Sequence, residues 1–248
     1  MPTIRLRTFA VIASLSMLAV ACTRSGTPMA PSAPSQPTET PAPMPPAPTP
    51  EPAPAQARYR VTFESTWSAS SHPTDFPDTA HYSGLIGGTH TAGATFWQAG
   101  AAASEGIQLM AERGRKTPLD MEVMNAIAAG TAEFVLSGPA LDVSPGTTSM
   151  EFDVSQSFPL VTLVTMVAPS PDWFTGVSGL LLFVNGQWLD EHTVELFPYD
   201  AGTDSGVSYE SANEVTDPRG IVARLEGYPV VAGGAVAPFG TFTFSRIP

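Results

Sequence analysis

The segment FPYDAGTDSG, residues 197–206, contains two carboxylates four residues apart, Asp200 and Asp204. No Lys or Arg occurs between Lys116 and Arg219, so no neighbour in the sequence can neutralise these two charges. Carboxylates without a counter-ion are either solvated or gathered around a cation. An all-oxygen ligand set suits a hard cation, and calcium tolerates irregular sets of about 6–8 oxygens.

The expected strands bring a third carboxylate to the same place. Residues 179–184 and 193–199 are rich in Leu, Val and Phe, and the Asn-Gly pair between them is a strong hairpin signal. Asp172 precedes the first strand and Asp200 follows the second, so both belong at the same end of the predicted hairpin. Asp204 lies in the same loop as Asp200. The sequence therefore predicts a calcium site formed by these three aspartates.

Other roles for the acidic segment stay open at this point. Asp beside Gly most often makes an ordinary turn, in which the carboxylate accepts a hydrogen bond from its own backbone. The tripeptide Asp204-Ser205-Gly206 occurs in aspartic proteases, but these need a second such loop or a symmetric dimer, and the tripeptide is not repeated here. The spacing is not that of an EF-hand. A metal-assisted hydrolase needs an open coordination position beside a general base, which the sequence does not show.

Three histidines, His72, His81 and His90, recur every nine residues. Zinc sites usually contain close pairs of ligands on one helix or hairpin, whereas these residues lie in a long loop-rich region. The pattern favours structural histidines that form hydrogen bonds.

The remaining sequence predicts a mainly β fold. Apolar residues alternate in YRVTFEST, residues 59–66, and several short runs rich in Val, Phe, Thr and Leu follow Gly130. This pattern of short β-rich segments favours an antiparallel β-sandwich. The absence of repeated strand–helix alternation excludes a TIM barrel or doubly wound sheet. Two inserted helices are expected: one over residues 95–114, where apolar residues recur at helical spacing, and one capped by Thr117.

Three segments are expected along the chain. Residues 1–22 combine a basic start, an apolar run and small residues before Cys22, as in a secretory signal peptide. The LAVAC ending also resembles a bacterial lipobox, in which Cys22 would be acylated; a plain signal peptide is the alternative. Residues 23–57 contain nearly half of the 26 prolines and predict a disordered tether. Residues 58–248 form the folded domain, which lacks cysteine and therefore disulfides and thiolate zinc sites.

The charge balance restricts the possible partners. The chain has 11 Lys and Arg against 23 Asp and Glu, a net charge of −12. Nucleic acids and anionic lipid surfaces are poor partners for such a chain, so membrane association is expected only through a lipid anchor. No nucleophile-elbow, phosphate-loop or dinucleotide-binding motif occurs.

The combination of PSPDW with YDAGTDSG resembles the spondin N-terminal (F-spondin) domain. Further pieces agree in the same order: YRVTFESTWSASSHPTDFP, AHYSGLIGGTHT, FWQAGAAASEGIQLMAERG and SFPLVTLVTMVAPSPDW. The resemblance covers nearly all of residues 58–248. It implies a C2-like β-sandwich with a calcium ion held at one end by Asp172, Asp200 and Asp204. The family's animal members are secreted matrix and adhesion proteins, but this domain has no cysteine and no thrombospondin-type repeat follows it, so their receptors are not transferred.

Together these features predict an exported, lipid-anchored, calcium-binding recognition or adhesion domain of the cell envelope, without catalytic activity. Its expected partner is a protein or glycan at the cell surface. Trp173 and Phe174, beside Asp172, either touch that partner as an apolar tip or close the end of the core. The alternatives to this function are a metal-assisted hydrolase and a purely structural domain in which calcium only stabilises the loops.

Overall fold

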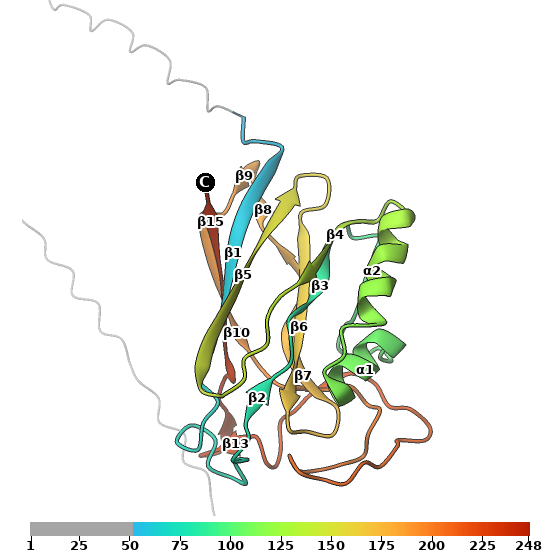
Figure 1. The fold of residues 1–248 in the computed structure, drawn as a ribbon, viewed down its shortest axis with the longest axis vertical. Helices are drawn as coiled ribbons and strands as arrows, with labels where there is room; N and C mark the ends of the chain where they lie inside the picture. The colour runs from blue at the N-terminus through green and yellow to red at the C-terminus, as the bar shows by residue number, and fades with distance from the viewer. Residues whose placement is uncertain (1–51) are drawn as a thin grey trace, which may run out of the picture. The chain divides into compact units, whose positions relative to one another are not determined.

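Two antiparallel sheets form the body of the protein in a computed structural model that describes residues 52–248 (Figure 1). The first sheet has four strands in the order β10 (Glu191–Leu196), β15 (Gly240–Ile247), β1 (Gln56–Ser65) and β5 (Gly146–Ser155). The second follows the order β12 (Ala223–Arg224), β11 (Tyr199–Asp200), β7 (Trp173–Leu181), β6 (Leu160–Ala168), β3 (Ile86–His90) and β4 (Ala132–Ser137). A short strand, β2 (His81–Tyr82), also pairs with β6.

Two small hairpins and two helices complete the described fold. The hairpins consist of β8 (Phe183–Val184) with β9 (Gln187–Trp188), and β13 (Val231–Ala232) with β14 (Ala235–Val236). The helices are α1 (Glu105–Arg113) and α2 (Leu119–Ala128). The prediction of a mainly β, antiparallel sandwich with two inserted helices is confirmed.

The core between the sheets follows from the alternation of apolar residues along the strands. Tyr59, Val61 and Phe63 of β1 are fully buried, as the sequence predicted, while the residues between them face outward or are half-buried. Phe242 and Phe244 of β15 lie opposite Phe63 and Val61 and are also fully buried. Burial of aromatic side chains of this size supplies much of the stability of such a core.

Strand β6 is buried on both faces, which explains why its sequence is a nearly continuous apolar run. Val161 and Leu163 belong to the core between the sheets, whereas Val164 and Met166 pack in a second cluster under the helices. Figure 1 shows α1 and α2 on the side of the second sheet that faces away from the first. The helices thus form a third layer over half of the sandwich.

The first helix is shorter than predicted. It begins at Glu105, and residues 95–104 form a loop, so the predicted helix over residues 95–114 is wrong in its first half. Gly100 has a left-handed φ of 87°, and Ser104 caps the helix because its hydroxyl accepts a hydrogen bond from the backbone N–H of Ile107. The apolar residues before Ser104 pack as loop residues instead.

The second helix ends where the sequence predicted but starts differently. Gly130 adopts a left-handed φ of 73° just after the last turn. Thr117 does not cap the backbone, contrary to the prediction, because its hydroxyl donates a hydrogen bond to the Asp120 carboxylate. The side chain of Glu122 instead links the two helices by accepting hydrogen bonds from Ser104 and from the N–H of Gly106.

The predicted hairpin between residues 179–184 and 193–199 does not form as a single ladder. The Asn-Gly turn joins only the short strands β8 and β9, and both of its residues have left-handed φ angles, as a two-residue hairpin turn requires. The longer flanking strands, β7 and β10, belong to opposite sheets. The chain crosses from one sheet to the other between them.

The folded body begins slightly before residue 58, the predicted boundary. Strand β1 starts at Gln56, and the carbonyl oxygen of Pro54 accepts a hydrogen bond of 2.7 Å from the Trp188 indole. Residues 1–51, which include Cys22, the predicted signal peptide and most of the predicted tether, lie outside the described residues. Within residues 52–248, no helix has the length and apolar character needed to cross a membrane.

Candidate metal-binding end of the sandwich

The acidic residues meet where β7 begins and β11 ends. In the ladder between these strands, Asp200 pairs with Trp173 and Tyr199 with Phe174. Asp172 immediately precedes β7, and its carbonyl oxygen accepts a hydrogen bond from the N–H of Ala201. The backbone therefore holds Asp172 beside Asp200, as predicted, although by pairing within the second sheet rather than through a hairpin.

Asp172 is the most enclosed of the three aspartates, with no exposed surface. Its Oδ2 atom accepts three hydrogen bonds: from the N–H of Thr203 at 2.7 Å, from the N–H of Asp204 at 3.0 Å and from the Thr203 hydroxyl at 3.1 Å. Its Oδ1 atom is buried and has no hydrogen-bond partner in the described part of the protein. A buried carboxylate oxygen without a donor is costly unless a cation or another group compensates it.

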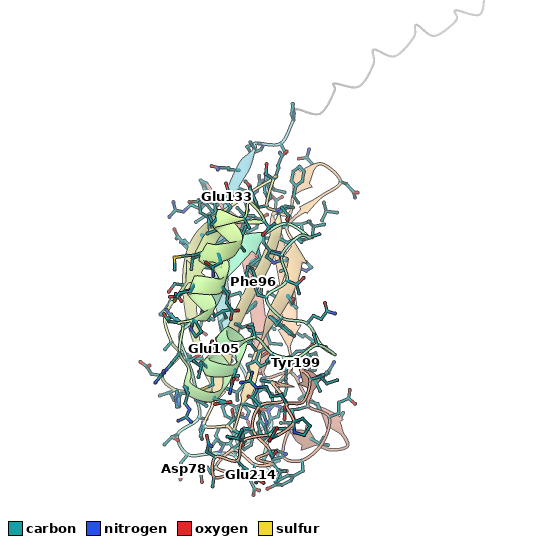
Figure 2. The ribbon with its side chains drawn as sticks, turned by 90° about the vertical axis from the view of Figure 1, so that its right-hand side faces the viewer. Asp78, Phe96, Glu105, Glu133, Tyr199 and Glu214 are labelled. Atoms are coloured by element: carbon teal, nitrogen blue, oxygen red, sulfur yellow. The ribbon has the colours of Figure 1, made fainter. Side chains whose placement is uncertain are left out.

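The other two aspartates partly shape their own loops. Asp200 accepts a hydrogen bond of 2.6 Å from the N–H of Gly202, and Asp204 accepts one of 2.8 Å from the N–H of Gly206. These are the local turns that Asp commonly makes before Gly. Asp204, which is 4% exposed, also accepts a hydrogen bond from the N–H of Glu214. Figure 2 shows Glu214 at the end of the body opposite Glu133.

The site carries negative charge that is not paired with a basic side chain in the described part of the chain. Within residues 52–248, none of the three aspartates forms an ion pair. Burial raises the pKa of Asp172 above its usual value, against the opposing effect of its three hydrogen bonds. Burial, and then the nearby Asp172 charge, raise the pKa of Asp200 to about 6. The end of the sandwich therefore favours either a proton or a cation.

The carboxylates do not form a closed ligand set. Among residues 52–248, no three or more His, Cys, Asp or Glu side chains are grouped as a metal site. Asp172 Oδ1 accepts no hydrogen bond from residues 52–248, whereas each oxygen of Asp204 already accepts one from the backbone. A carboxylate oxygen has two lone pairs, so these bonds do not prevent Asp204 from adding a ligand.

The raised pKa of Asp200 leads to a pH prediction for calcium-free protein. The native pKa of about 6 exceeds the ordinary value of 3.8, so ionised Asp200 lowers stability above pH 6. This cost disappears as the pH falls from 7 to 4, because the native state then binds the proton. Asp200→Asn removes the charge but keeps an acceptor for the N–H of Gly202.

The stability gained by Asp200→Asn over the parent is therefore expected to be greatest at pH 7 and to shrink toward pH 4. Urea unfolding in the presence of a chelator at several pH values measures this difference. A difference that is constant across the range would contradict the assigned pKa of Asp200.

Trp173 and Phe174 are not available to a partner. Trp173 is 1% exposed and Phe174 is fully buried, so of the two roles expected for them the structure supports closing the end of the core and not contact with a partner. Their side chains leave opposite faces of β7, because residues alternate along a strand. The Trp173 ring meets Tyr209 at 5.2 Å between centroids, and the Phe174 ring meets Trp97 at 5.1 Å.

The three spaced histidines have structural hydrogen-bond partners, in agreement with the sequence. The His72 ring contacts the Ala237 carbonyl, the His81 ring contacts the Thr79 carbonyl, and the His90 ring contacts the Thr162 hydroxyl and the Thr91 carbonyl. Within residues 52–248 these rings do not belong to any metal-site grouping.

Sequence reasoning missed an open groove of about 720 Å³ on the side of the sandwich. It lies between β7 and β10 and is lined in part by Trp97, Gln98, Glu195 and Tyr199. No sequence signal could have identified it, because its residues come from several separate segments that only the fold brings together. The loop of residues 95–104 that replaces the predicted helical turns forms one wall.

The protein is an antiparallel β-sandwich domain with helices over one sheet and aspartates buried at one end. Comparison with known proteins identifies its family. The family model described as Spondin_N matches residues 57–230, and the chain belongs to this family. Spondin-2 of Rattus norvegicus is 34% identical over 198 residues, which cover 77% of this chain and 58% of the relative.

Two further relatives show the same relationship. Spondin-2 of Homo sapiens is 36% identical over 173 residues, covering 68% of this chain and 52% of the relative. Spondin-1 of Mus musculus is 37% identical over 172 residues, covering 66% of this chain and 21% of the relative. The chain therefore spans only about half the length of the Spondin-2 proteins that it matches.

Proposed function

We propose that the protein is an exported recognition domain of the adhesion type, that calcium organises the acidic end of its sandwich, and that it has no catalytic role. The observation that carries the calcium proposal is the buried Asp172 carboxylate, whose Oδ1 atom has no donor among residues 52–248 while the charged Asp200 lies beside it. Membership of the spondin family supports the adhesion role.

In this proposal the carboxylates of Asp172 and Asp200 contribute oxygen ligands and Asp204 completes the acidic set. Calcium fits better than magnesium because it accepts flexible, irregular oxygen ligands, whereas magnesium requires a nearly octahedral set. The ion would satisfy the buried Oδ1 atom and offset both the burial and the nearby Asp172 charge that raise the pKa of Asp200. The loops of residues 200–206 and 214–216 would then be held more firmly against β7.

Calcium is expected to raise the melting temperature of the purified, chelator-treated protein. At a free concentration one hundred times its dissociation constant, a ligand specific for the native state stabilises by about 2.7 kcal/mol. Thermal unfolding with graded calcium measures the effect, and magnesium at the same concentrations is expected to give a smaller shift. The control Asp153→Asn removes an exposed carboxylate on β5 and is expected to keep the full calcium response.

The absence of a calcium shift in protein shown by elemental analysis to be metal-free would overturn the calcium proposal. A shift retained in both Asp172→Asn and Asp200→Asn would place the ion elsewhere.

The proposal includes export by residues 1–22 and attachment to the cell envelope through an acylated Cys22. Two or more acyl chains anchor stably, whereas a single chain gives only marginal binding. Mass spectrometry of the mature N-terminus is expected to find a lipid-modified cysteine. The Cys22→Ser protein is expected to leave the membrane fraction; a mature chain cleaved elsewhere and unmodified would contradict the anchor.

A further inference from the structure

An acidic pocket lies between two loops and is separate from the candidate calcium site. It is lined by residues 75–78, from the loop between β1 and β2, and by residues 208–210, from the loop after β11. None of the three aspartates of the candidate calcium site lines it. Its volume of about 360 Å³ falls within the range of roughly 300–1,000 Å³ that is typical of ligand sites. Figure 2 shows Asp78 at the same end of the body as Glu214.

Aromatic packing holds the two loops that form the acidic pocket. Trp67 is fully buried, and its ring meets Phe76 of the first loop at 5.3 Å and Tyr209 of the second at 5.2 Å between centroids. A third loop contributes a hydrogen bond from the Tyr228 hydroxyl to the Asp75 carboxylate. The pocket is therefore supported by the core, because each of its walls carries a ring that packs on Trp67.

The walls of the acidic pocket carry three carboxylates and no positive charge. Asp75, Asp78 and Glu210 are exposed, and none of them forms an ion pair within residues 52–248. No Lys, Arg or His lines the pocket. The carboxylates are nevertheless not grouped as a metal site in the described part of the chain. Negative charge spread around a pocket in this way suits an extended organic cation better than a single metal ion.

The buried hydroxyl of Tyr209 is a second, independent indication of a ligand. Tyr209 lines the pocket and is 2% exposed, and its hydroxyl has no hydrogen-bond partner among residues 52–248. The Trp67 indole lies nearby, but the two groups do not form a hydrogen bond. Burial, and then the nearby Asp75 charge, raise the pKa of Tyr209 to about 12, against the opposing effect of Trp67. This neutral hydroxyl beside Asp75 lacks a partner that a ligand could supply.

We propose that the acidic pocket binds an arginine side chain of a protein partner. A guanidinium group has five N–H donors in a planar fork, which form paired hydrogen bonds with carboxylates and leave a donor for the Tyr209 hydroxyl. The half-buried Phe76 ring offers apolar surface to the methylene stem. Lysine fits less well, because its ammonium group is a compact point charge. This inference rests on the proposed recognition function, for which it names the chemistry of the partner.

NMR titration of the purified protein with short peptides tests the inference. The acetylated and amidated peptides have the sequence Gly-Ser-X-Ser-Gly, in which X is arginine, lysine or the uncharged analogue citrulline, and calcium is present throughout. The arginine peptide is expected to cause saturable shifts in the backbone signals of residues 75–78 and 208–210. The lysine peptide is expected to bind about threefold more weakly, and the citrulline peptide is not expected to bind.

Variants separate the acidic pocket from the general negative charge of this end. Glu210→Gln and Asp78→Asn each remove an exposed charge from the lining and are expected to weaken binding about threefold. Tyr209→Phe removes only the unpartnered hydroxyl and is expected to weaken binding without lowering the melting temperature. The matched control Glu214→Gln removes an exposed carboxylate that does not line the pocket, and it is expected to bind like the parent.

Absence of arginine binding, equal binding of the citrulline or lysine peptide, or shifts confined to residues 200–204 would each overturn the inference. Binding unchanged in both Glu210→Gln and Tyr209→Phe would also overturn it. The calcium-induced shift in melting temperature is measured on the same samples. A normal calcium shift without arginine binding rejects the pocket inference alone, whereas arginine binding at residues 75–78 and 208–210 without a calcium shift rejects only the calcium proposal.

Discussion

Asp172→Ala is expected to lower the free energy of unfolding by about 3 kcal/mol or more, even without calcium. The substitution removes the Oδ2 atom that accepts hydrogen bonds from the N–H groups of Thr203 and Asp204 and from the Thr203 hydroxyl. Each buried donor left without a partner costs roughly 1–3 kcal/mol, and charge-assisted bonds lie toward the upper end. Chemical denaturation of the chelated protein measures the loss.

Asp172→Asn separates this structural role from ion binding. Asparagine retains one oxygen that can accept the bonds from Thr203 and Asp204, and it removes a charge that raises the pKa of Asp200. The chelated variant is therefore expected to be much more stable than Asp172→Ala but to lose the calcium response. Equal destabilisation by Ala and Asn would show that the charge of Asp172, rather than its hydrogen bonds, supports the native loop.

Trp67→Ala is expected to lower the free energy of unfolding by about 3–5 kcal/mol, the usual range for truncating a buried Trp or Phe. Trp67 is fully buried. Its ring lies between 5.2 and 5.7 Å from those of four other aromatic residues: Phe76, Tyr82, Tyr209 and Phe239. Removing it would leave a large cavity that these rings cannot fill. Urea denaturation of the parent and the variant at the same calcium concentration measures the difference.

The effect of Trp67→Ala is also expected to reach the acidic end. Tyr209 contacts both Trp67 and Trp173, and Trp173 adjoins Asp172. The Trp67→Ala variant should therefore bind calcium more weakly than the parent. The control for stability is Val215→Ala, at an exposed position, which should change the free energy of unfolding by no more than about 0.5 kcal/mol. A Trp67→Ala protein as stable as the Val215→Ala control would show that the cluster contributes little to the core.

The sheets could be predicted because their strands carry a simple periodicity. The final strand runs from Gly240 to Ile247, as the run GTFTFSRI indicated, and β1 shows the predicted alternation. Strand β6 was also predictable, because a stretch of nine residues with seven apolar side chains and no glycine or proline fits a strand covered on both faces. Which strands pair was not predictable, since pairing depends on contacts between segments far apart in the chain.

The first helix shows why the spacing of apolar residues alone does not predict where a helix begins. Phe96 and Ala103 lie at positions that would extend the apolar stripe of Ile107 and Met110, yet helical structure begins only at Glu105. The cap at Ser104 and the left-handed Gly100 interrupt the pattern. Local hydrogen bonding by a short polar side chain competed with the apolar periodicity and determined the boundary.

The candidate acidic site was predictable in position but not in detail. Asp172 and Asp200 were expected together because strands of opposite direction return to the same end, and this holds although β7 and β10 lie in different sheets. Burial could not be predicted, so the sequence left open whether Trp173 contacts a partner or closes the core. The groove also depends on burial and on the path of one loop.

The positions of the two ends of the described chain determine which end of the domain faces away from an attachment point. Pro54 and Gln56 border the same surface depression as Pro248, and Figure 1 shows the start of β1 and the C-terminus at the end opposite the long loops that follow β11. Anything joined to either terminus, whether a membrane anchor, a solid support or another domain, thus attaches at one pole. The end of the sandwich that carries the aspartates then lies at the other pole, so attachment at the start of β1 should leave that end facing solution.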